Sequence, residues 1–243
     1  MASSLSLARR FWLAYLALAA LFGAAVGTFI VLEERPGPTP TPPWSAWKPT
    51  AGSPGAAQQQ IAEHVGARYR LPSGKKLVDV LAGQPGPASD PIRTVAVART
   101  LDPKAPSDLR ARVDSSQTAM YILCGDVKTC AIEPTPAHAA ALRREALELA
   151  LYTFRYIDEA NSVATFIGLS RVLFVTKPEF SRQLQSPLRV TLPQANASTP
   201  GTVSPIENET VDSLTAKRLF DYRVEHEPTS GARVLLLAPP AGG

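Results

Sequence analysis

A long uncharged stretch near the start of the chain is the strongest pattern of hydrophobic and polar positions. Residues 11–32 contain no charged side chain, and Arg9 and Arg10 come directly before them. At about 1.5 Å per residue, this segment forms roughly 33 Å of helix, which matches a hydrocarbon layer about 30 Å thick. The pattern predicts a single transmembrane helix over residues 11–32, in contact with the lipid bilayer.

The flanking charges predict how this helix is oriented. Because basic residues favour the cytoplasmic side, Arg9 and Arg10 place residues 1–10 in the cytoplasm and everything after residue 32 outside the cell membrane. A cleaved signal peptide is the alternative, since Gly23, Ala24 and Ala25 offer a small-residue cleavage site. The uncharged segment is longer than the roughly 7–15 residues of a signal-peptide core, which favours an uncleaved anchor.

Small residues recur along one face of the predicted span. Ala19, Gly23 and Gly27 are four residues apart, so their side chains share a helix face. Such a face lets two backbones approach closely, which predicts helix packing in the membrane with a second copy or a partner helix. The alternative is that small residues are simply common in an alanine-rich span.

Residues 33–55 form a proline-rich linker. Seven prolines lie between Pro36 and Gly55, and each removes a backbone donor and fixes φ, so the composition predicts a semi-rigid stalk. Trp44 and Trp47 interrupt it, although exposed tryptophan is unfavourable. We expect both to anchor the linker, by docking on the folded domain, by inserting among headgroups or by binding a partner.

Beyond the linker, residues 56–243 combine helical and strand-like periodicities. Helices are expected over residues 56–69 and, as the principal one, over residues 136–160. A loop is expected over residues 193–209. Strands are expected over residues 92–99, 118–123, 162–167, 171–176, 188–192, 217–227 and 233–237. This order predicts an extracytoplasmic α+β domain with a mixed or antiparallel sheet packed by the principal helix.

The principal helix has clear start and face signals. Thr135 is a suitable N-cap, and Pro136 stands at the first helical position, where its missing N–H has no cost. Apolar residues such as Leu149 recur at helical spacing and indicate a face that covers a sheet. Arg144 and Glu148 fall on the opposite side, where we expect a solvated i,i+4 pair.

The charge balance of the chain adds little to the predicted architecture. The 243 residues contain 25 basic and 21 acidic side chains, a balance too even to indicate nucleic-acid binding. Half of the net charge of +4 lies in Arg9 and Arg10, where it determines topology. The domain after residue 55 therefore has no strong electrostatic preference for one class of partner.

The two cysteines predict a structural disulfide. Cys124 and Cys130 both lie outside the membrane in the predicted topology, where oxidation is favoured, and Gly125-Asp126 suggests a chain reversal between them. The C-x-x-C spacing of redox motifs is absent, and two cysteines supply only half of a tetrahedral zinc site. We expect no metal and no cofactor.

The candidates for catalysis are weak. Ser73 and Lys76 match S-x-x-K, but Pro72 and Gly74 suit a loop and no K-T-G motif follows. His226 could act as a base, although its acidic neighbours indicate a solvated strand end. Formal glycosylation acceptors, Asn196 and Asn208, fall in the predicted loop over residues 193–209.

Taken together, these patterns favour a single-pass, membrane-anchored protein whose extracytoplasmic domain is a non-enzymatic interaction or assembly component of the cell envelope. A membrane-anchored hydrolase is the first alternative, with the catalytic candidates named above. A sensory ectodomain is the second, although a tail of residues 1–10 cannot hold an output domain, so it would act through a partner.

Overall fold

The computed structural model describes residues 11–12, 14–24, 42–99, 109–125, 130–132, 135–193 and 204–240. The chain divides into two compact units, Met1–Pro42 and Pro43–Gly243. In the first unit, residues 11–12 and 14–24 are helical, and they include Ala19 and Gly23. Within the described residues, no helix has both the length and the apolar character needed to cross a membrane.

Several sequence predictions fall outside the described residues. These are the cytoplasmic tail over residues 1–10, residues 25–32 of the predicted span with Gly27, the linker up to residue 41, and Asn196. The transmembrane helix over residues 11–32 and its packing face therefore stay predictions. Of the linker, residues 42–55 are described, and the second unit already begins at Pro43, ahead of the predicted domain boundary at residue 56.

The second unit is built on an eight-stranded sheet with the order β1-β4-β5-β6-β7-β8-β2-β3. Two neighbouring pairs, β4–β5 and β2–β8, are parallel, and the other five are antiparallel. The prediction of an α+β fold with a mixed sheet is confirmed. The strands are β1 (Asp79–Ala82), β2 (Ile92–Ala98), β3 (Leu109–Asp114), β4 (Thr118–Cys124), β5 (Ser162–Ile167), β6 (Arg171–Thr176), β7 (Leu219–His226) and β8 (Arg233–Ala238).

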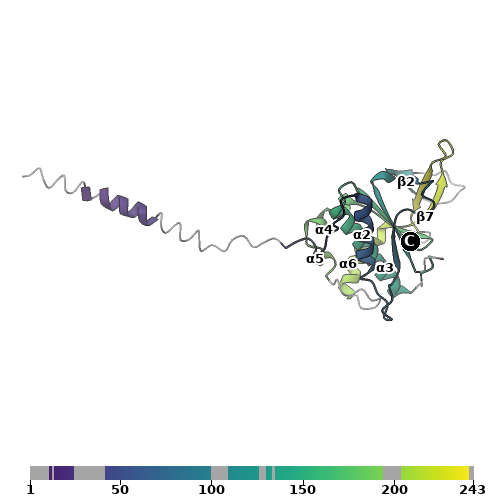
Figure 1. Cartoon of the computed structure of the whole chain (residues 1–243), viewed down its shortest axis with the longest axis horizontal. Coiled ribbons are helices and arrows are strands. Elements are labelled where there is room, and N and C mark those ends of the chain that lie inside the picture. The colour runs from purple at the N-terminus through teal and green to yellow at the C-terminus, as the bar shows by residue number, and fades with distance from the viewer. Residues whose placement is uncertain are drawn as a thin grey trace, which may run out of the picture. The chain divides into compact units, whose positions relative to one another are not determined.

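The described part of this unit also contains three longer α-helices and two short ones, and Figure 1 shows α2, α3 and α6 gathered on one side of the sheet. Each longer helix starts with a proline that follows a hydroxyl N-cap, Ser53, Thr135 or Ser204, whose side chain accepts a hydrogen bond from the first turn. The helices are α2 (Pro54–Gly66), α3 (Pro136–Tyr156), α4 (Ser181–Gln185), α5 (Leu188–Thr191) and α6 (Pro205–Thr215).

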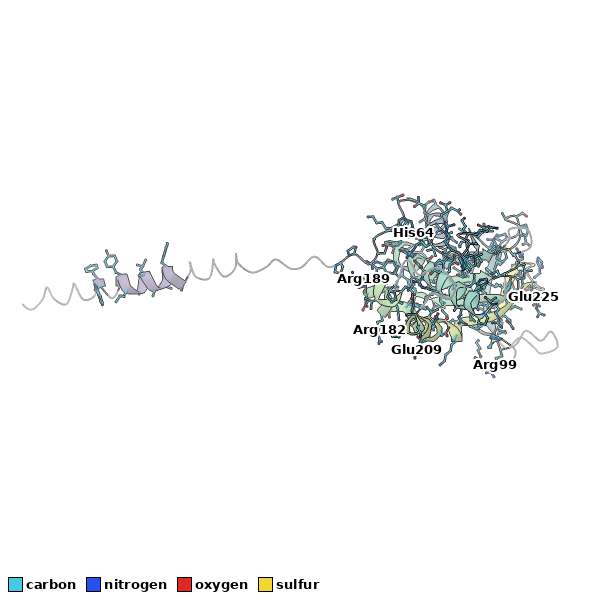
Figure 2. The ribbon with its side chains drawn as sticks, turned by 90° about the horizontal axis from the view of Figure 1, so that it is seen from below. His64, Arg99, Arg182, Arg189, Glu209 and Glu225 are labelled. Atoms are coloured by element: carbon cyan, nitrogen blue, oxygen red, sulfur yellow. A yellow bond between two sulfur atoms is a disulfide. The ribbon has the colours of Figure 1, made fainter. Side chains whose placement is uncertain are left out.

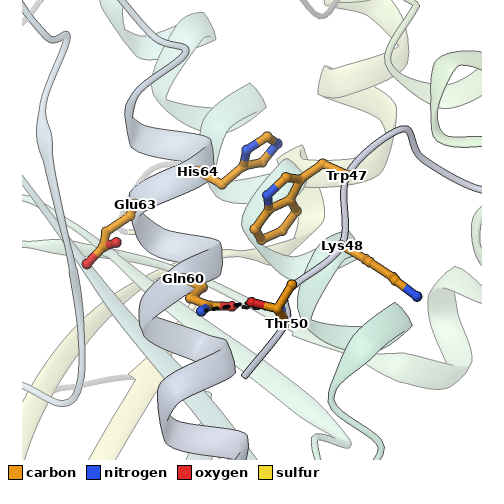
Figure 3. A pocket seen from close by; sticks show the side chains of 6 residues that line it. All are labelled: Trp47, Lys48, Thr50, Gln60, Glu63 and His64. Carbon is orange, nitrogen blue, oxygen red and sulfur yellow. Dashed lines mark hydrogen bonds between the residues drawn. The ribbon is translucent and has the colours of Figure 1, made fainter. Parts of the chain in front are cut away.

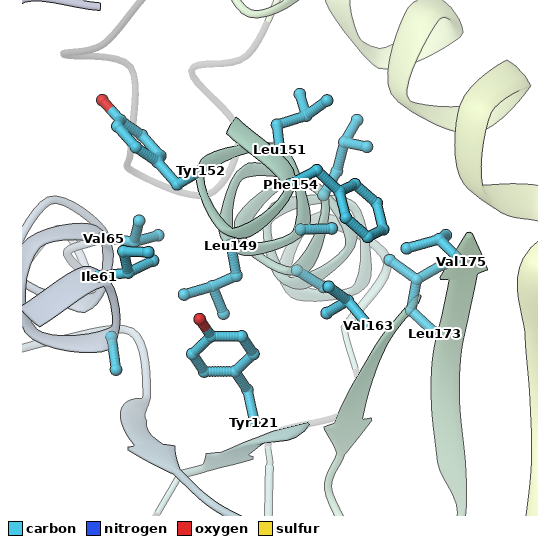
Figure 4. Packing of buried hydrophobic residues seen from close by; sticks show 14 of the residues in the cluster. Ile61, Val65, Tyr121, Leu149, Leu151, Tyr152, Phe154, Val163, Leu173 and Val175 are labelled. Atoms are coloured by element: carbon cyan, nitrogen blue, oxygen red, sulfur yellow. The ribbon is translucent and has the colours of Figure 1, made fainter. Parts of the chain in front are cut away.

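The main core lies between α3 and the middle of the sheet. Figure 4 shows Tyr121, Val163 and Leu173 rising from three adjacent strands toward Leu149 and Phe154 of α3. These side chains are almost completely buried. Because side chains alternate along a strand, every second residue of β4, β5 and β6 faces this helix.

The opposite face of the same strands is also buried. Met120, Phe166 and Phe174 point away from α3 and pack in a second apolar cluster with Val95 of β2 and Leu235 of β8. In the strand order, β8 and β2 are well separated from β4 and β5. The sheet must therefore curl back over its own face, which explains why the central strands are apolar on both sides.

Two predicted elements have a different structure. Residues 188–192 were expected to form a strand, but α5 occupies residues 188–191, and both Leu188 and the C-cap Leu192 are buried. The prediction of a loop over residues 193–209 is wrong for its last part, because α6 begins at Pro205. Proline there starts a helix after the Ser204 cap instead of breaking one.

The predicted disulfide is confirmed. Cys124, at the end of β4, is bonded to Cys130. Gly125 lies close to the backbone after Cys130, since a Cβ on Gly125 would lie 2.1 Å from the backbone oxygen of Ala131. Only glycine fits at this position without a shift of the backbone.

Removing this disulfide should lower stability. Closing a loop of this size restricts the unfolded chain by an amount equivalent to roughly 2–3 kcal/mol. We expect the double substitution Cys124→Ala and Cys130→Ala to lower the free energy of unfolding in urea by about that amount. Reductant should produce the same loss in the wild type and none in the variant, and an unchanged urea midpoint would contradict the prediction.

Candidate functional site

The most unusual feature of the second unit is a group of buried charges on α3. Arg144, Glu145 and Glu148 have no more than 1% of their surface exposed. The expected i,i+4 pair of Arg144 and Glu148 is present at 3.4 Å, but the expectation that it is solvated is wrong. Helices α2 and α6 both pack against α3, so the face that would otherwise meet water is covered.

Arg144 is the centre of this group. Its Nε donates to Glu207 Oε1 of α6 at 2.6 Å, and its Nη1 donates to the hydroxyl of Tyr69. That hydroxyl donates in turn to Glu148 Oε2 at 2.7 Å. Arg68 donates to the other oxygen of Glu148 at 2.5 Å. We call Arg68, Tyr69, Arg144, Glu145, Glu148 and Glu207 the buried charge cluster; it joins α3 and α6 to the turn that follows α2.

Burial governs the protonation of the cluster. Burial, followed by the charge of Glu148, raises the pKa of the Glu145 carboxyl well above its ordinary value, and no hydrogen bond satisfies either of its oxygens. Burial lowers the pKa of Arg144, but Tyr69, Glu148 and Glu207 outweigh that effect and the net shift is upward. Protonation of Glu145 would leave two cations facing two carboxylates, so that the cluster would have no excess charge.

A glutamine at position 145 should make the protein more stable at neutral pH. The folded pKa of Glu145 is raised, so its contribution is fully present below pH 4.5, the ordinary value, and is lost as pH rises toward the folded pKa. We expect Glu145→Gln to match the wild type near pH 4 and to exceed it increasingly as pH rises, in urea unfolding followed by circular dichroism. The matched control Glu159→Gln removes an exposed carboxylate and should leave the pH profile unchanged. If the stability of the wild type, Glu145→Gln and Glu159→Gln changed with pH in the same way, a raised pKa of Glu145 would be contradicted.

The second feature is the end of the proline-rich linker, which lies against the helices. We call Pro43–Thr50 the docked tether. The ring of Trp44 is 8% exposed and makes edge contacts with Tyr152 and Tyr156 of α3, with centroids 5.4 and 5.8 Å away. Its backbone oxygen accepts a hydrogen bond from the amide of Leu188 at 2.7 Å, and its Nε1 donates to the carbonyl of Gln183 at 3.3 Å. Trp44 therefore fastens the tether to α3, α4 and α5.

Trp47 provides a second attachment, on α2. Its ring stacks on His64 with a centroid separation of 3.9 Å and an angle of 3° between the planes, and its carbonyl accepts from the hydroxyl of Tyr156 at 3.2 Å. Burial, followed by the charge of Arg68, lowers the pKa of His64 to about 4. The imidazole is thus neutral at neutral pH, so it stacks on the indole without carrying a charge.

A pocket of about 370 Å³ opens beside this stack, and Figure 3 shows its lining. Gln60 closes one wall by accepting hydrogen bonds from the amides of Thr50 and Ala51 at 2.8 and 3.1 Å. Glu63 is its one acidic side chain, and Lys48 extends toward solvent (Figure 3). These groups fix the tether to α2, and they do not combine a nucleophile with a base.

The catalytic candidates from the sequence each have separate neighbours. Ser73 and Lys76 are exposed in the turn between α2 and β1, where Gly74 has a φ of +81°, so the motif lacks the helical geometry of serine–lysine enzymes. Lys76 Nζ lies 3.4 Å from Asp79. His226, at the end of β7, lies 3.3 Å from Asp90. None of the three lines the pocket beside Trp47.

Known proteins offer no guide to this arrangement. No protein-family model, no curated protein and no solved structure matches the chain. Among the residues that the structure describes, no group of three histidine, cysteine or acidic side chains could hold a metal ion. The buried charge cluster and the docked tether are therefore the features on which a functional argument can rest.

Proposed function

We propose that this chain is a single-pass membrane protein, anchored through residues 11–32, whose exported domain is a non-enzymatic interaction or assembly component of the cell envelope. The uncharged segment and the arginines before it support the anchor and the topology. The disulfide between Cys124 and Cys130 supports an oxidising location for the domain.

The docked tether is the observation that carries the proposal. Two tryptophans fasten the chain between anchor and domain at a defined place on α2, α3, α4 and α5. A domain that acts only on diffusing substrates does not need its linker to be attached to its own surface. A fixed attachment instead shortens the chain between the proposed anchor and the domain, and this suits a component that holds one surface near a partner.

The edge strand β3 offers such a surface. It pairs with β2 on one side, and Arg110, Ala111 and Arg112 are exposed along it. An exposed strand edge can accept a strand from a partner through backbone hydrogen bonds, and arginines protect it from indiscriminate pairing.

Crosslinking in the native membrane tests the proposal. We would place a photoreactive amino acid at Ala111 on β3 and, as the matched control, at the exposed Gln59 on α2. A discrete, heavier adduct is expected from position 111 and none from position 59. Absence of adducts from β3 and from every other exposed strand position would contradict an interaction role.

The location is tested separately by the state of the thiols. In intact cells, Cys124 and Cys130 should react with a maleimide only after reduction, because the proposed domain is exported and oxidised. Two thiols that react without reduction would contradict export, whatever the crosslinking result.

A further inference from the structure

We infer that the surface around the docked tether is a binding surface for the anionic headgroups of the membrane that anchors the chain. This inference rests on the proposed anchor and goes beyond it, because an anchored domain need not touch the bilayer. We call the exposed residues Lys48, Arg182, Arg189 and Val190 the tether face.

The length of free chain is the first argument. Trp44 is already fixed to the domain, so residues 33–43 alone separate it from the end of the predicted span. Eleven residues reach at most roughly 40 Å even when fully extended. A domain of this size has a radius of gyration of about 16 Å, so its diameter is comparable with that reach. In the proposed topology, the side of the domain on which the tether docks therefore lies within roughly 40 Å of the end of the span.

The charge of this side is the second argument. The two segments that meet at Trp44, residues 42–53 and 180–192, carry Lys48, Arg182 and Arg189 and no acidic residue. All three are exposed. Figure 2 places Arg182 and Arg189 at one end of the domain, with Arg99 and Glu225 at the other. An anionic lipid surface attracts each such basic residue by about 1 kcal/mol, or roughly fivefold.

Nearby acidic residues offset this charge only in part. Glu179 comes directly before the second segment, but its carboxylate is paired with Arg218 at 3.1 Å. Glu209 of α6 is labelled on the same side of Figure 2, and Asp158 is accompanied by Arg155 and Lys177 in the pocket that they line together.

An exposed apolar residue lies among these charges. Val190 is 66% exposed and directly follows Arg189 on α5. A single exposed valine needs no explanation by itself. Next to Arg189 and two residues from Leu188, which bonds to Trp44, its side chain is placed to enter the interface while the arginines meet the phosphates.

A fluorescent probe on the full chain tests this inference. The chain would be reconstituted into phosphatidylcholine vesicles with or without phosphatidylglycerol, and labelled at Val190→Cys or, as the control, at Leu169→Cys. Leu169 is 73% exposed and lies in the turn that joins β5 to β6. The opposite end of this strand pair, where the amide of Lys177 donates to the carbonyl of Asn161, is the end that leads to α4. The control site is thus a strand length, about 20 Å, from the start of α4.

The probe at position 190 should be quenched by headgroup-labelled lipid, more strongly with phosphatidylglycerol and less at high salt, while the probe at position 169 should not respond. Arg182→Gln with Arg189→Gln should reduce the ratio of bound to free domain by roughly 25-fold. The control pair Lys75→Gln and Arg171→Gln, at two exposed basic positions outside the tether face, should leave it unchanged.

The outcomes separate the inference from the anchor. Equal responses at positions 190 and 169, or a response at 190 that ignores both phosphatidylglycerol and the two arginines, would overturn the tether face and leave the anchor standing. Failure of the full chain to float with vesicles of either composition would overturn the anchor, and the tether face with it.

Discussion

Replacement of Arg144 by methionine should lower the free energy of unfolding by about 3–5 kcal/mol. The guanidinium is 1% exposed and donates to Glu207 and to the hydroxyl of Tyr69. Its loss would leave the Glu207 carboxylate, itself 2% exposed, without that partner in a region that water does not reach. Removing one member of a buried charged group is costly because the remaining charge stays desolvated. Urea unfolding at neutral pH, followed by circular dichroism, would measure the change.

The adjacent residue provides the control for this prediction. Arg143 lies on the same helix and pairs with Asp212 at 2.6 Å, but both side chains are partly exposed. We expect Arg143→Met to lower the free energy of unfolding by no more than about 1 kcal/mol. A triple variant, Arg144→Met with Glu148→Gln and Glu207→Gln, should recover part of the loss because no uncompensated carboxylate remains. Equal losses for Arg143→Met and Arg144→Met would contradict the central place of Arg144.

The burial of this cluster also shows where sequence reasoning on α3 stops. Helical spacing correctly predicted that Leu149 faces the sheet and that the helix starts at Pro136. The same spacing says nothing about what covers the other side, which here is α2 and α6. A signal was present, because apolar residues occupy nearly the whole circumference of α3 and such helices are buried all round. The charges at Arg144 and Glu148 hid that signal.

Some elements of this fold, such as α6, which packs against α3, are hard to predict from short windows of sequence. Helix α6 follows two prolines and several polar residues, so its composition resembles a loop until the Ser204 cap and the first-turn Glu207 are considered. Strand β3, with exposed Arg110 and Arg112, lacks the alternation of a half-buried strand because it lies at an edge. Both elements owe their structure to the rest of the fold, which a window of sequence does not contain.

The linker illustrates a different limit. Its prolines correctly indicate that residues 43–53 form neither helix nor strand. An irregular segment can still pack, however, and the tryptophans were the one sign that it does. Both are among the expected anchors, and the structure places Trp44 against Tyr152 and Trp47 against His64. The proline content thus predicted an irregular backbone, while the two tryptophans indicated which residues attach it to the domain.

Replacement of Trp44 by alanine should be comparably damaging, at about 3–5 kcal/mol, because a large buried ring leaves a cavity that a fixed helix layer cannot fill. Trp44→Phe keeps most of the apolar contact and loses the Nε1 hydrogen bond to Gln183, for which about 1 kcal/mol is expected. Trp47→Ala, at a half-buried position, should fall between them. Urea unfolding of the three variants would establish this order.

Hydrogen exchange distinguishes loss of the tether from general weakening. The amide of Leu188 donates to the carbonyl of Trp44, so in Trp44→Ala it should exchange faster, while the amide of Val163 in β5 should change only as much as global stability does. If Trp44 merely filled space in the core, both amides would accelerate together. A selective effect at Leu188 would mean that the tether can detach from a folded domain, which would lengthen the chain between the domain and the proposed anchor. The orientation that we propose thus depends on a hydrogen bond and a buried ring that the folded core could survive without.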